Sequence, residues 1–266
     1  MDWYPLWNSL RIAAISTGII FFAGIFAAYY IAKLPRLIKG VLDVVLTLPL
    51  VLPPTVVGYL LLRVLGPKRL IGAWVLETFG IRLVMTWWSA IFATAVVIFP
   101  LMYRTARGAF ESLDPNMLDA ARTLGWSNGR IFLRLMLPLA WSSIASGTVL
   151  AFARALGEFG CTLFLAGNQL GSTRTIPIAI YFEWMNGNTE ATWFWTIVLL
   201  VFSFLVILFI NLWSRHTTRY RQKSSHEGRS PKPRRNGTRG GGRRRSAKGL
   251  REDSAGSADV LGEGVA

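Results

Sequence analysis

The chain has 266 residues, of which 52% are hydrophobic, and it carries 11 Trp and a formal net charge of +15. This apolar composition excludes an ordinary soluble domain and indicates a protein that lies largely in lipid. The single cysteine, Cys161, excludes a disulfide bond within the chain and is expected to be a small packing residue.

Five uncharged, apolar runs are long enough to cross a bilayer as helices, since a hydrocarbon core of about 30 Å takes about 20 helical residues. In chain order they are residues 12–32, 44–62, 83–103, 135–153 and 191–214. The fourth run continues past Arg154 and Glu158 to Leu165. Residues 176–182 are too few to cross, so we expect a re-entrant or surface helix in an outer loop. The predicted fold is an all-α polytopic membrane protein with five transmembrane helices.

Prolines interrupt two of these runs. Pro49, Pro53 and Pro54 lie in the second run, and Pro100 lies in the third. Each proline removes a backbone donor, and a kinked or broken helix is tolerated where neighbours or a water-filled cavity satisfy the freed carbonyls. We expect kinks at these positions, either static ones that improve packing or hinges.

Lys and Arg in short loops predict the orientation of the chain, because they concentrate on the cytoplasmic side of a membrane. The basic residues after the first run and between the third and fourth are Lys33, Arg36, Lys39, Arg104, Arg107, Arg122, Arg130 and Arg134. With five spans these loops and the basic C-terminal segment share one side, so the C-terminus is cytoplasmic and the N-terminus lies outside. Lys68, Arg69 and Arg82 lie on the outer side and weaken the bias. Residues 12–32 are too long a run for a cleavable signal peptide and lack a basic leader, so we expect none.

The polar segment between the third and fourth runs predicts two short helices. Asp114 can cap a helix that begins at Pro115, and Gly125 suits the left-handed residue that ends it. Ser127 can cap the second helix, which we expect Pro138 to stop.

Two small residues, Ala120 and Ala121, lie in the first of these helices, and Asp119 precedes them. The two alanines leave a shallow patch that another protein can approach closely, and Asp119 beside it can form a polar contact with that protein. We therefore expect a protein from outside the membrane to dock on this loop. The alternative is an ordinary amphipathic interfacial helix.

A pair of opposite charges lies within the fourth run. An ionisable residue in hydrocarbon costs about 2.5–3.5 kcal/mol on insertion scales, so it normally faces protein or water. Arg154 and Glu158 are four residues apart, which on one helical face allows them to pair. The pair is either a structural salt bridge or a polar lining of a translocation path, where a paired arginine eases the passage of an anion. Gly157 and Gly160 would permit close helix contact.

The C-terminal segment differs from the rest of the chain. Residues 214–266 hold 14 Lys and Arg against 5 Asp and Glu, whereas residues 1–213 hold 15 against 9. The segment has too few apolar residues to fold alone, so we predict a membrane domain over residues 1–213 and a basic disordered cytoplasmic tail over residues 214–266. No aromatic residue follows Tyr220 on which a base could stack, which favours anionic lipid headgroups over nucleic acid as the partner of the tail.

Residue types that support catalysis or metal binding are scarce in the apolar runs. His216 and His226 both lie in or beside the tail, and the sequence has no phosphate-cradling Gly-x-x-x-x-Gly-Lys loop. We expect no catalytic residue, no metal site and no cofactor in this chain, and no ATP hydrolysis by the chain alone.

The polar loop resembles the cytoplasmic coupling motif of importer-type ABC permeases, which reads Glu-Ala-Ala, three residues, Gly, nine residues, Ile, one residue, Leu-Pro. Here Asp119 stands where the family usually has Glu, and Leu135 stands where it often has Ile. The resemblance implies the importer-type ABC permease fold, with a cytoplasmic coupling-helix loop. The residues it implies for coupling to an ATPase are Asp119, Ala120, Ala121, Gly125, Leu137 and Pro138.

Further motifs are similar to those of the molybdate ABC transporter permease over roughly residues 5–213. The stretches that carry this resemblance are residues 48–55, 99–102, 154–160, 166–168 and 173–177. Sulfate and thiosulfate permeases share the Arg-x-x-Gly-Glu pattern and the coupling loop, whereas the Thr-Arg-Thr-Ile-Pro stretch favours molybdate. The tail has no counterpart in this family pattern.

The resemblance implies a homodimer of permease subunits in the cytoplasmic (inner) membrane, two cytoplasmic ATPase subunits that bind ATP, and an extracytoplasmic molybdate-binding protein. Arg154, Gly157 and Glu158 are then candidates for the translocation path. Open alternatives are a sulfate, thiosulfate or tungstate permease, a membrane-embedded enzyme that uses Glu158 and Arg154, and a non-transporting membrane scaffold. The enzyme alternative lacks a nucleophile and base pair near those residues and leaves the docking loop unexplained.

Overall fold

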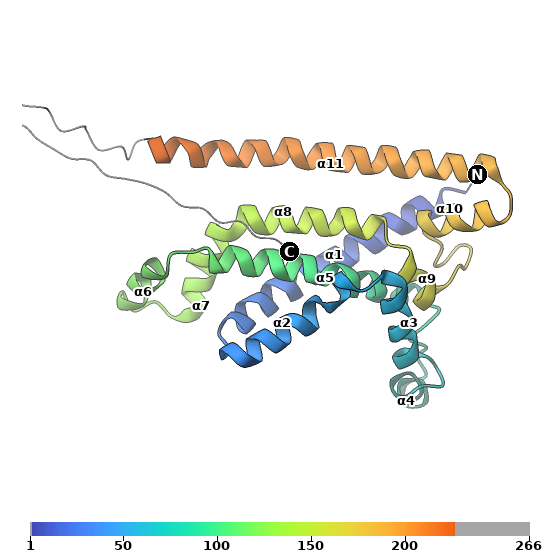
Figure 1. The fold of residues 1–266 in the computed structure, drawn as a ribbon, viewed down its shortest axis with the longest axis horizontal. Coiled ribbons are helices and arrows are strands. Elements are labelled where there is room, and N and C mark those ends of the chain that lie inside the picture. Colours follow the sequence, from blue (N-terminus) through green and yellow to red (C-terminus); the bar gives the residue numbers. More distant parts are fainter. Residues whose placement is uncertain (1, 227–266) are drawn as a thin grey trace, which may run out of the picture. The chain divides into compact units, whose positions relative to one another are not determined.

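The computed structural model describes residues 2–226, and every regular element in this part of the chain is a helix (Figure 1), as predicted. The helices are α1 (Tyr4–Ala32), α2 (Arg36–Val51), α3 (Pro54–Leu65), α4 (Leu70–Phe79), α5 (Trp87–Glu111), α6 (Pro115–Thr123), α7 (Asn128–Ile131), α8 (Leu137–Leu156), α9 (Gly160–Ala166), α10 (Ile176–Met185) and α11 (Thr189–His226). A π-helical segment, Phe132–Met136, joins α7 to α8.

The long apolar helices match the predicted spans. Among the described residues, 4 helices are long and apolar enough to cross a membrane: Tyr4–Ala32, Trp87–Glu111, Asn128–Leu156 and Thr189–Leu208. They overlap the first, third, fourth and fifth predicted runs. The bent pair α2 and α3 brings the number to 5 if it is counted as one span. The five-span pattern is thus present, with its second span broken.

The second span is broken at Pro53 and Pro54, where the sequence predicts a kink. α2 and α3 are bent by 115° relative to each other. Pro53 and Pro54 both lack an N–H, so two consecutive helical hydrogen bonds cannot form there, and a proline also disfavours helical geometry in the residue before it. Leu52 is accordingly extended, with φ −73° and ψ 142°. By contrast, Pro49 and Pro100 remain inside α2 and α5.

The main core lies where α5 packs against α1 on one side and α8 on the other. Ile98, Met102 and Tyr103 of α5 are fully buried there, together with Ala28 of α1 and Ile144 of α8. Small residues at such contacts let helices approach closely in a membrane, where van der Waals packing replaces most of the hydrophobic driving force. This core fixes the C-terminal half of α5 against α1 and α8.

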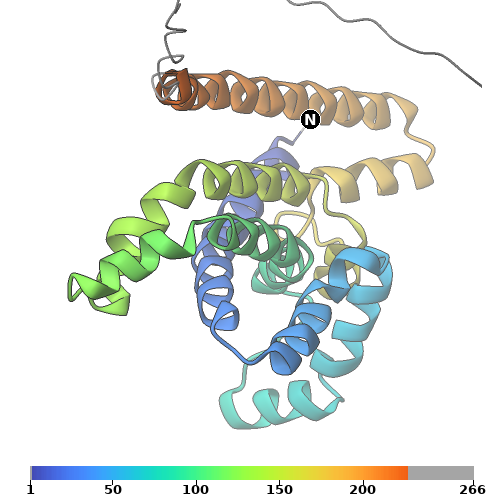
Figure 2. The ribbon, with the colours of Figure 1, turned by 60° about the vertical axis from the view of Figure 1, so that its left-hand side comes forward.

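The short helices lie at opposite ends of this bundle. Figures 1 and 2 show α6 and α7 at the end where α5 finishes and α8 begins, and α9 and α10 at the other end. Buried polar groups at the start of α1 hold the loop before α10: the Asn8 amide donates to the carbonyls of Ser172 and Arg174 at 3.1 and 3.0 Å, and Ile176 N–H donates to Ser9 Oγ at 2.8 Å. α10 corresponds to the predicted short helix at residues 176–182, whereas α4 was not predicted.

α11 packs on the bundle over a small part of its surface. Trp195, 5% exposed, lies in a small cluster with Ile176 and Ala179 of α10. Outward-facing apolar side chains, including those of Phe204 and Leu200, are suited to lipid or to another membrane helix. The helix extends to His226, past the predicted domain boundary at residue 214. Residues 227–266 of the predicted tail lie outside the described residues, so its disorder stays a prediction.

Candidate functional site

α6 begins and ends where the sequence predicts. Asp114 Oδ1 accepts a hydrogen bond from the Asn116 N–H at 2.9 Å, and Pro115 is the first helical residue. Gly125 follows the helix with φ +76°, a left-handed conformation that L-residues with a side chain rarely adopt. These caps make α6 a discrete helix between α5 and α7.

The two alanines of α6 differ in exposure, which corrects the predicted patch. Ala120 is exposed, but Ala121 is 7% exposed and therefore faces the chain itself. The exposed apolar side chains along α6 and its C-cap are instead those of Met117, Ala120 and the C-cap residue Leu124, which recur at helical spacing. Leu124 is 76% exposed. Asp119 is exposed beside them and accepts a 2.5 Å hydrogen bond from the Arg122 guanidinium.

The second short helix does not stop at Pro138, contrary to the prediction. Ser127 Oγ accepts from the Arg130 N–H at 3.4 Å and caps α7, which passes through the π-helical segment directly into α8. Pro138 lacks an N–H and its ring crowds the carbonyl four residues earlier, so an inserted residue in a π turn relieves the conflict without ending the helix. Leu137 is half-buried and Pro138 is exposed at the start of α8.

Aromatic side chains anchor this loop to α1 and α5. The Tyr29 hydroxyl donates to the Asn128 carbonyl at 3.3 Å, and the Tyr29 and Phe132 rings lie 4.3 Å apart. Phe110 of α5 contacts Phe132 from another side, with ring centroids 5.8 Å apart. Lys33 Nζ lies 3.7 Å from the centre of the Tyr29 ring, in cation–π geometry. The loop therefore packs against the C-terminal ends of α1 and α5.

Arg154 and Glu158 form an ion pair at 2.8 Å, as predicted, but not on one continuous helix. α8 ends at Leu156, and Glu158 lies in the break before α9. Its Oε1 accepts a hydrogen bond from the Cys161 N–H at 3.0 Å, which satisfies a free donor at the start of α9. The Glu158 side chain is 1% exposed and that of Arg154 is 36% exposed, so the carboxylate is enclosed while the guanidinium reaches a surface.

The two glycines near this pair have different surroundings. A Cβ on Gly160 would lie 2.8 Å from Thr55 Cγ2 and 2.9 Å from the Thr55 nitrogen, so the start of α9 packs directly on the start of α3. Gly157 has open space around it, and the prediction of close helix contact is wrong there. This close contact joins α3, which follows the break at Pro53, to α9, which follows the break at Gly157. The contact lies beside the Arg154–Glu158 pair.

The sequence did not predict a row of ion pairs and hydrogen bonds between α2 and α5, here called the ladder. Its members are Lys39 and Asp43 of α2 and Tyr103, Arg107 and Glu111 of α5. Lys39 Nζ lies 2.7 Å from Glu111 Oε1, and Arg107 Nε donates to the same oxygen at 2.9 Å. Arg107 also pairs with Asp43, which accepts a hydrogen bond from the hydroxyl of buried Tyr103. From the sequence, Lys39 and Arg107 indicate only the orientation of the chain. The available signal was the occurrence of opposite charges near the same ends of two apolar runs.

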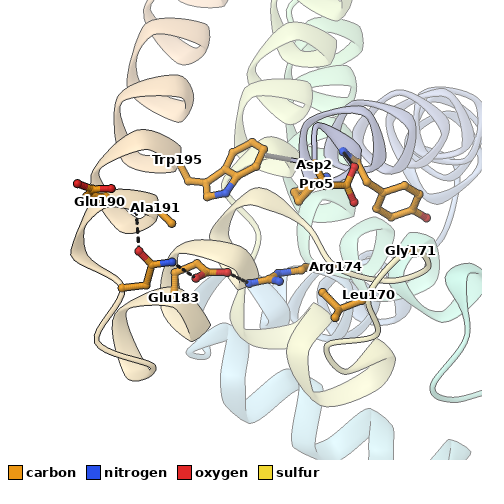
Figure 3. A pocket seen from close by; sticks show the side chains of 11 residues that line it. Asp2, Pro5, Leu170, Gly171, Arg174, Glu183, Glu190, Ala191 and Trp195 are labelled. Atoms are coloured by element: carbon orange, nitrogen blue, oxygen red, sulfur yellow. Dashed lines mark hydrogen bonds and ion pairs between the residues drawn. The ribbon is translucent and has the colours of Figure 1, made fainter.

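A cavity of about 310 Å³ lies at the start of α1, beside the first turn of α11 and the loop before α10 (Figure 3). Arg174 donates to Glu183 Oε1 at 2.7 Å, and the Asn188 amide donates to the other oxygen of Glu183 at 3.0 Å. Arg174 and Glu183 are only 14% and 19% exposed. The Arg174–Glu183 pair, which the sequence also did not predict, holds the loop before α10 against α10.

Comparison with known proteins places the chain in a family. The profile of the binding-protein-dependent transport system inner membrane component matches residues 20–219. Two relatives are similar over most of their length. The putative molybdenum transport system permease protein YvgM of Bacillus subtilis is 39% identical over 212 residues, which cover 80% of this chain and 93% of the relative. The molybdenum transport system permease protein ModB of Escherichia coli is 45% identical over 180 residues, which cover 68% and 79%.

Solved structures share the fold at low sequence identity. A bacterial ABC transporter that imports alginate superposes with a TM-score of 0.66 at 19% identity, covering 81% of this chain and 79% of that one. The inward-facing MetNI methionine ABC transporter gives a TM-score of 0.60 at 13% identity, covering 80% and 94%. Profile, relatives and fold agree: the chain belongs to the family of binding-protein-dependent transport system inner membrane components.

Proposed function

We propose that this chain is the permease subunit of an ABC importer that carries molybdate across the cytoplasmic membrane. The observation that carries the proposal is the 39% identity to the Bacillus subtilis relative, which extends over 93% of that protein. The Escherichia coli relative, at 45% identity, bears a molybdenum transport name as well. The permease itself performs no chemistry in this proposal, because ATP is bound and hydrolysed by separate subunits.

The working assembly contains two copies of this chain, two cytoplasmic ATPase subunits and an external molybdate-binding protein. Five spans from one chain supply half of the pathway that such an importer needs. A related fold, the alginate ABC transporter, has been solved in complex with an alginate-bound periplasmic protein, which supports an external delivery protein here. The basic charge of segment 214–266 favours anionic lipid headgroups over nucleic acid as its partner.

The exposed side of α6 docks the ATPase. Met117, Ala120 and Leu124 offer an apolar stripe, and Asp119 offers a charge beside it. Ala121 contributes from within, because its small side chain lets α6 lie close to the rest of the loop. Gly125 sets the direction of the chain into α7, while Leu137 and Pro138 lie where the loop passes into α8.

The docking loop lies on the cytoplasmic side and the cavity of Figure 3 lies outside. α1 has 29 residues, a length of about 43 Å, which exceeds the hydrocarbon thickness of about 30 Å. Tyr4 contacts the loop before α10 at one end of α1, and Tyr29 contacts α7 at the other. Together with the placement of Lys and Arg, this geometry supports an external N-terminus and a cytoplasmic C-terminus.

Arg154 and Glu158 belong to the translocation path. The partly exposed guanidinium of Arg154 can attract an oxyanion, while Glu158 neutralises part of its charge and prevents tight binding. Gly157 next to Glu158 has open space around it, which leaves room for an anion to pass.

Uptake measurements test the proposal. Cells that lack this chain should lose high-affinity molybdate uptake and the activity of molybdenum-cofactor enzymes, and they should recover both on re-expression. Tungstate should compete, because its charge and shape are nearly those of molybdate, while growth on sulfate should continue. Sulfate or thiosulfate dependence with intact molybdate uptake would assign the chain to the other oxyanion class. Normal uptake of all these anions would favour the enzyme or scaffold alternative.

A further inference from the structure

α2 is attached to the bundle mainly through charged side chains. None of its residues is fully buried. Its outward apolar residues are Leu37, Ile38, Val41, Val44, Val45, Leu48, Leu50 and Val51. Leu42 and Leu46 pack partly against the main core. A helix with so little buried apolar surface depends on its polar contacts to hold a defined position.

These polar contacts form a ladder with regular spacing on both helices. Lys39 and Asp43 are one turn apart on α2, and Tyr103, Arg107 and Glu111 are one turn apart on α5. Arg107 bridges the ladder, since it pairs with both Asp43 and Glu111. The Arg107 and Asp43 side chains are only 20% and 23% exposed. Separating the pairs would leave partly desolvated charges without partners, so the two helices resist being pulled apart.

The ladder lies immediately beside the docking loop. Glu111 is the last residue of α5, and only Ser112 and Leu113 separate it from the Asp114 cap of α6. Ser112 remains tied to the end of α5 through its N–H, which donates to the Gly108 carbonyl at 3.1 Å. A displacement of α6 therefore passes directly into the last turns of α5, where the ladder begins.

The other end of this connection reaches the Arg154–Glu158 pair. α2 leads through the Pro53 break into α3, and α3 packs closely on α9. A Cβ on Gly58 of α3 would lie 2.8 Å from the Cys161 Cα, and the Cys161 N–H donates to Glu158. Contacts this tight transmit a movement of α3 to the residues beside Glu158, because close-packed interiors do not absorb it.

We infer that Lys39 and Asp43 are positioning residues that make α2 follow α5 when the ATPases move α6. The inference rests on the proposed docking of the ATPase at α6. In this mechanism the ladder carries the displacement from α5 into α2, and α2 and α3 carry it to the enclosed carboxylate of Glu158. Without the ladder, the ATPases still bind, but α2 no longer responds to them.

The test uses the reconstituted complex with its ATPase subunits and binding protein. Leu48, which is 47% exposed and lies on α2 outside the ladder, is replaced by a spin-labelled cysteine in a Cys161→Ser background. Pulsed electron resonance then reads the distance between the labels of the two copies, with and without trapped nucleotide. The disconnecting variant is Lys39→Met with Asp43→Asn, which removes the two charges that α2 contributes to the ladder and leaves α5 unchanged. Arg36→Met is the matched control, because Arg36 lies on the same helix but forms none of the ion pairs found among the described residues.

The inference predicts a nucleotide-dependent distance change in the parent complex and in Arg36→Met, and its loss in Lys39→Met/Asp43→Asn at normal ATPase occupancy. Molybdate transported per ATP should fall at least about fivefold, since allosteric couplings of 1–3 kcal/mol correspond to about 5–150-fold. Lys39→Arg with Asp43 intact should retain the response, because it keeps the charge next to Glu111.

Persistence of the distance change in the disconnected variant, or its absence from the parent complex, would overturn the inference. Arg107→Gln, which cuts the ladder from the α5 side, must give the same loss; a retained change there would also count against it. Failure of the ATPase subunits to bind the parent chain would instead contradict the proposed function, and the occupancy measurement separates the two results.

Discussion

Ala120 and Ala121 are neighbours in the sequence, but the fold gives them different surroundings. Ala120 is exposed on α6, whereas Ala121 is 7% exposed. A helix turns by 100° per residue, so adjacent side chains of a helix lying on a surface commonly divide between its inner and outer faces. A substitution at one position therefore tests a contact with another protein, and the same substitution at its neighbour tests the chain's own packing.

Ala120→Trp and Ala121→Trp should separate these two roles. We expect Ala120→Trp to lower ATPase stimulation by loaded binding protein in reconstituted vesicles, because the ring occupies the docking face, with thermal unfolding unchanged. Ala121→Trp should instead destabilise the chain by about 1–3 kcal/mol, the usual cost of overfilling a packed site. Wild-type stimulation in Ala120→Trp, at normal ATPase occupancy, would mean that α6 is not the coupling element.

Arg154 and Glu158 differ in burial, which predicts the order of two stability changes. Arg154→Met leaves the enclosed Glu158 carboxylate unpaired and should cost up to about 3 kcal/mol. Glu158→Gln leaves the partly exposed Arg154 charge near solvent, and the amide oxygen can still accept from the Cys161 N–H, so about 1 kcal/mol is expected. Thermal denaturation of the detergent-purified chain measures both. A lower melting temperature for Glu158→Gln than for Arg154→Met would contradict the assignment of the carboxylate as the enclosed partner.

Among the secondary-structure elements, the predicted second and fourth spans are interrupted at three junctions: between α2 and α3, between α7 and α8, and between α8 and α9. Each interruption has a local chemical cause. Adjacent prolines break α2 from α3, and the π-helical segment accommodates Pro138 without ending the helix. α8 and α9 are separated at Gly157, where Glu158 supplies an acceptor to the start of α9.

The turn between α6 and α7 tests backbone geometry separately from side-chain packing. Gly125 has φ +76°, and a Cβ there would contact nothing within 4 Å, so only backbone strain opposes a side chain. Gly125→Val should cost about 1–2 kcal/mol and redirect the chain into α7, with a loss of ATPase stimulation and uptake. Gly125→Asn is the control, because Asn adopts the left-handed conformation more readily and should retain both activities. Equal activity of the two variants would show that the turn does not orient the docking loop.

At the scale of the whole molecule, the proposed topology makes the two ends of α1 accessible from opposite sides of the membrane. In a Cys161→Ser background, a cysteine at Leu170, which is 76% exposed near the start of α1, should react with a membrane-impermeant thiol reagent added outside intact cells. A cysteine at Asn116, exposed on α6, should react only after the inner face is opened. Labelling of both positions from one side would contradict the orientation.

Features that depend on neighbouring residues could be predicted from the sequence. Apolar runs of about 20 residues located the spans, because the thickness of lipid sets a minimum helix length. Asp114, Pro115 and Gly125 located both ends of α6, since caps act within a few residues of the helix they bound. The Arg154–Glu158 pairing was also predicted, because residues this close in sequence remain near each other even where the helix breaks.

Features that depend on residues far apart in the sequence emerged only from the packed fold. Asp43 and Tyr103 are 60 residues apart and Lys39 and Glu111 are 72 apart, so no local pattern could pair them. The inward side of α6 likewise depends on how the whole loop packs, which is why the exposure of Ala121 was predicted wrongly. The physical reason is that helix length, caps and bends follow from the backbone's own bonding, whereas side-chain partners are chosen only when the packed helices bring particular faces together.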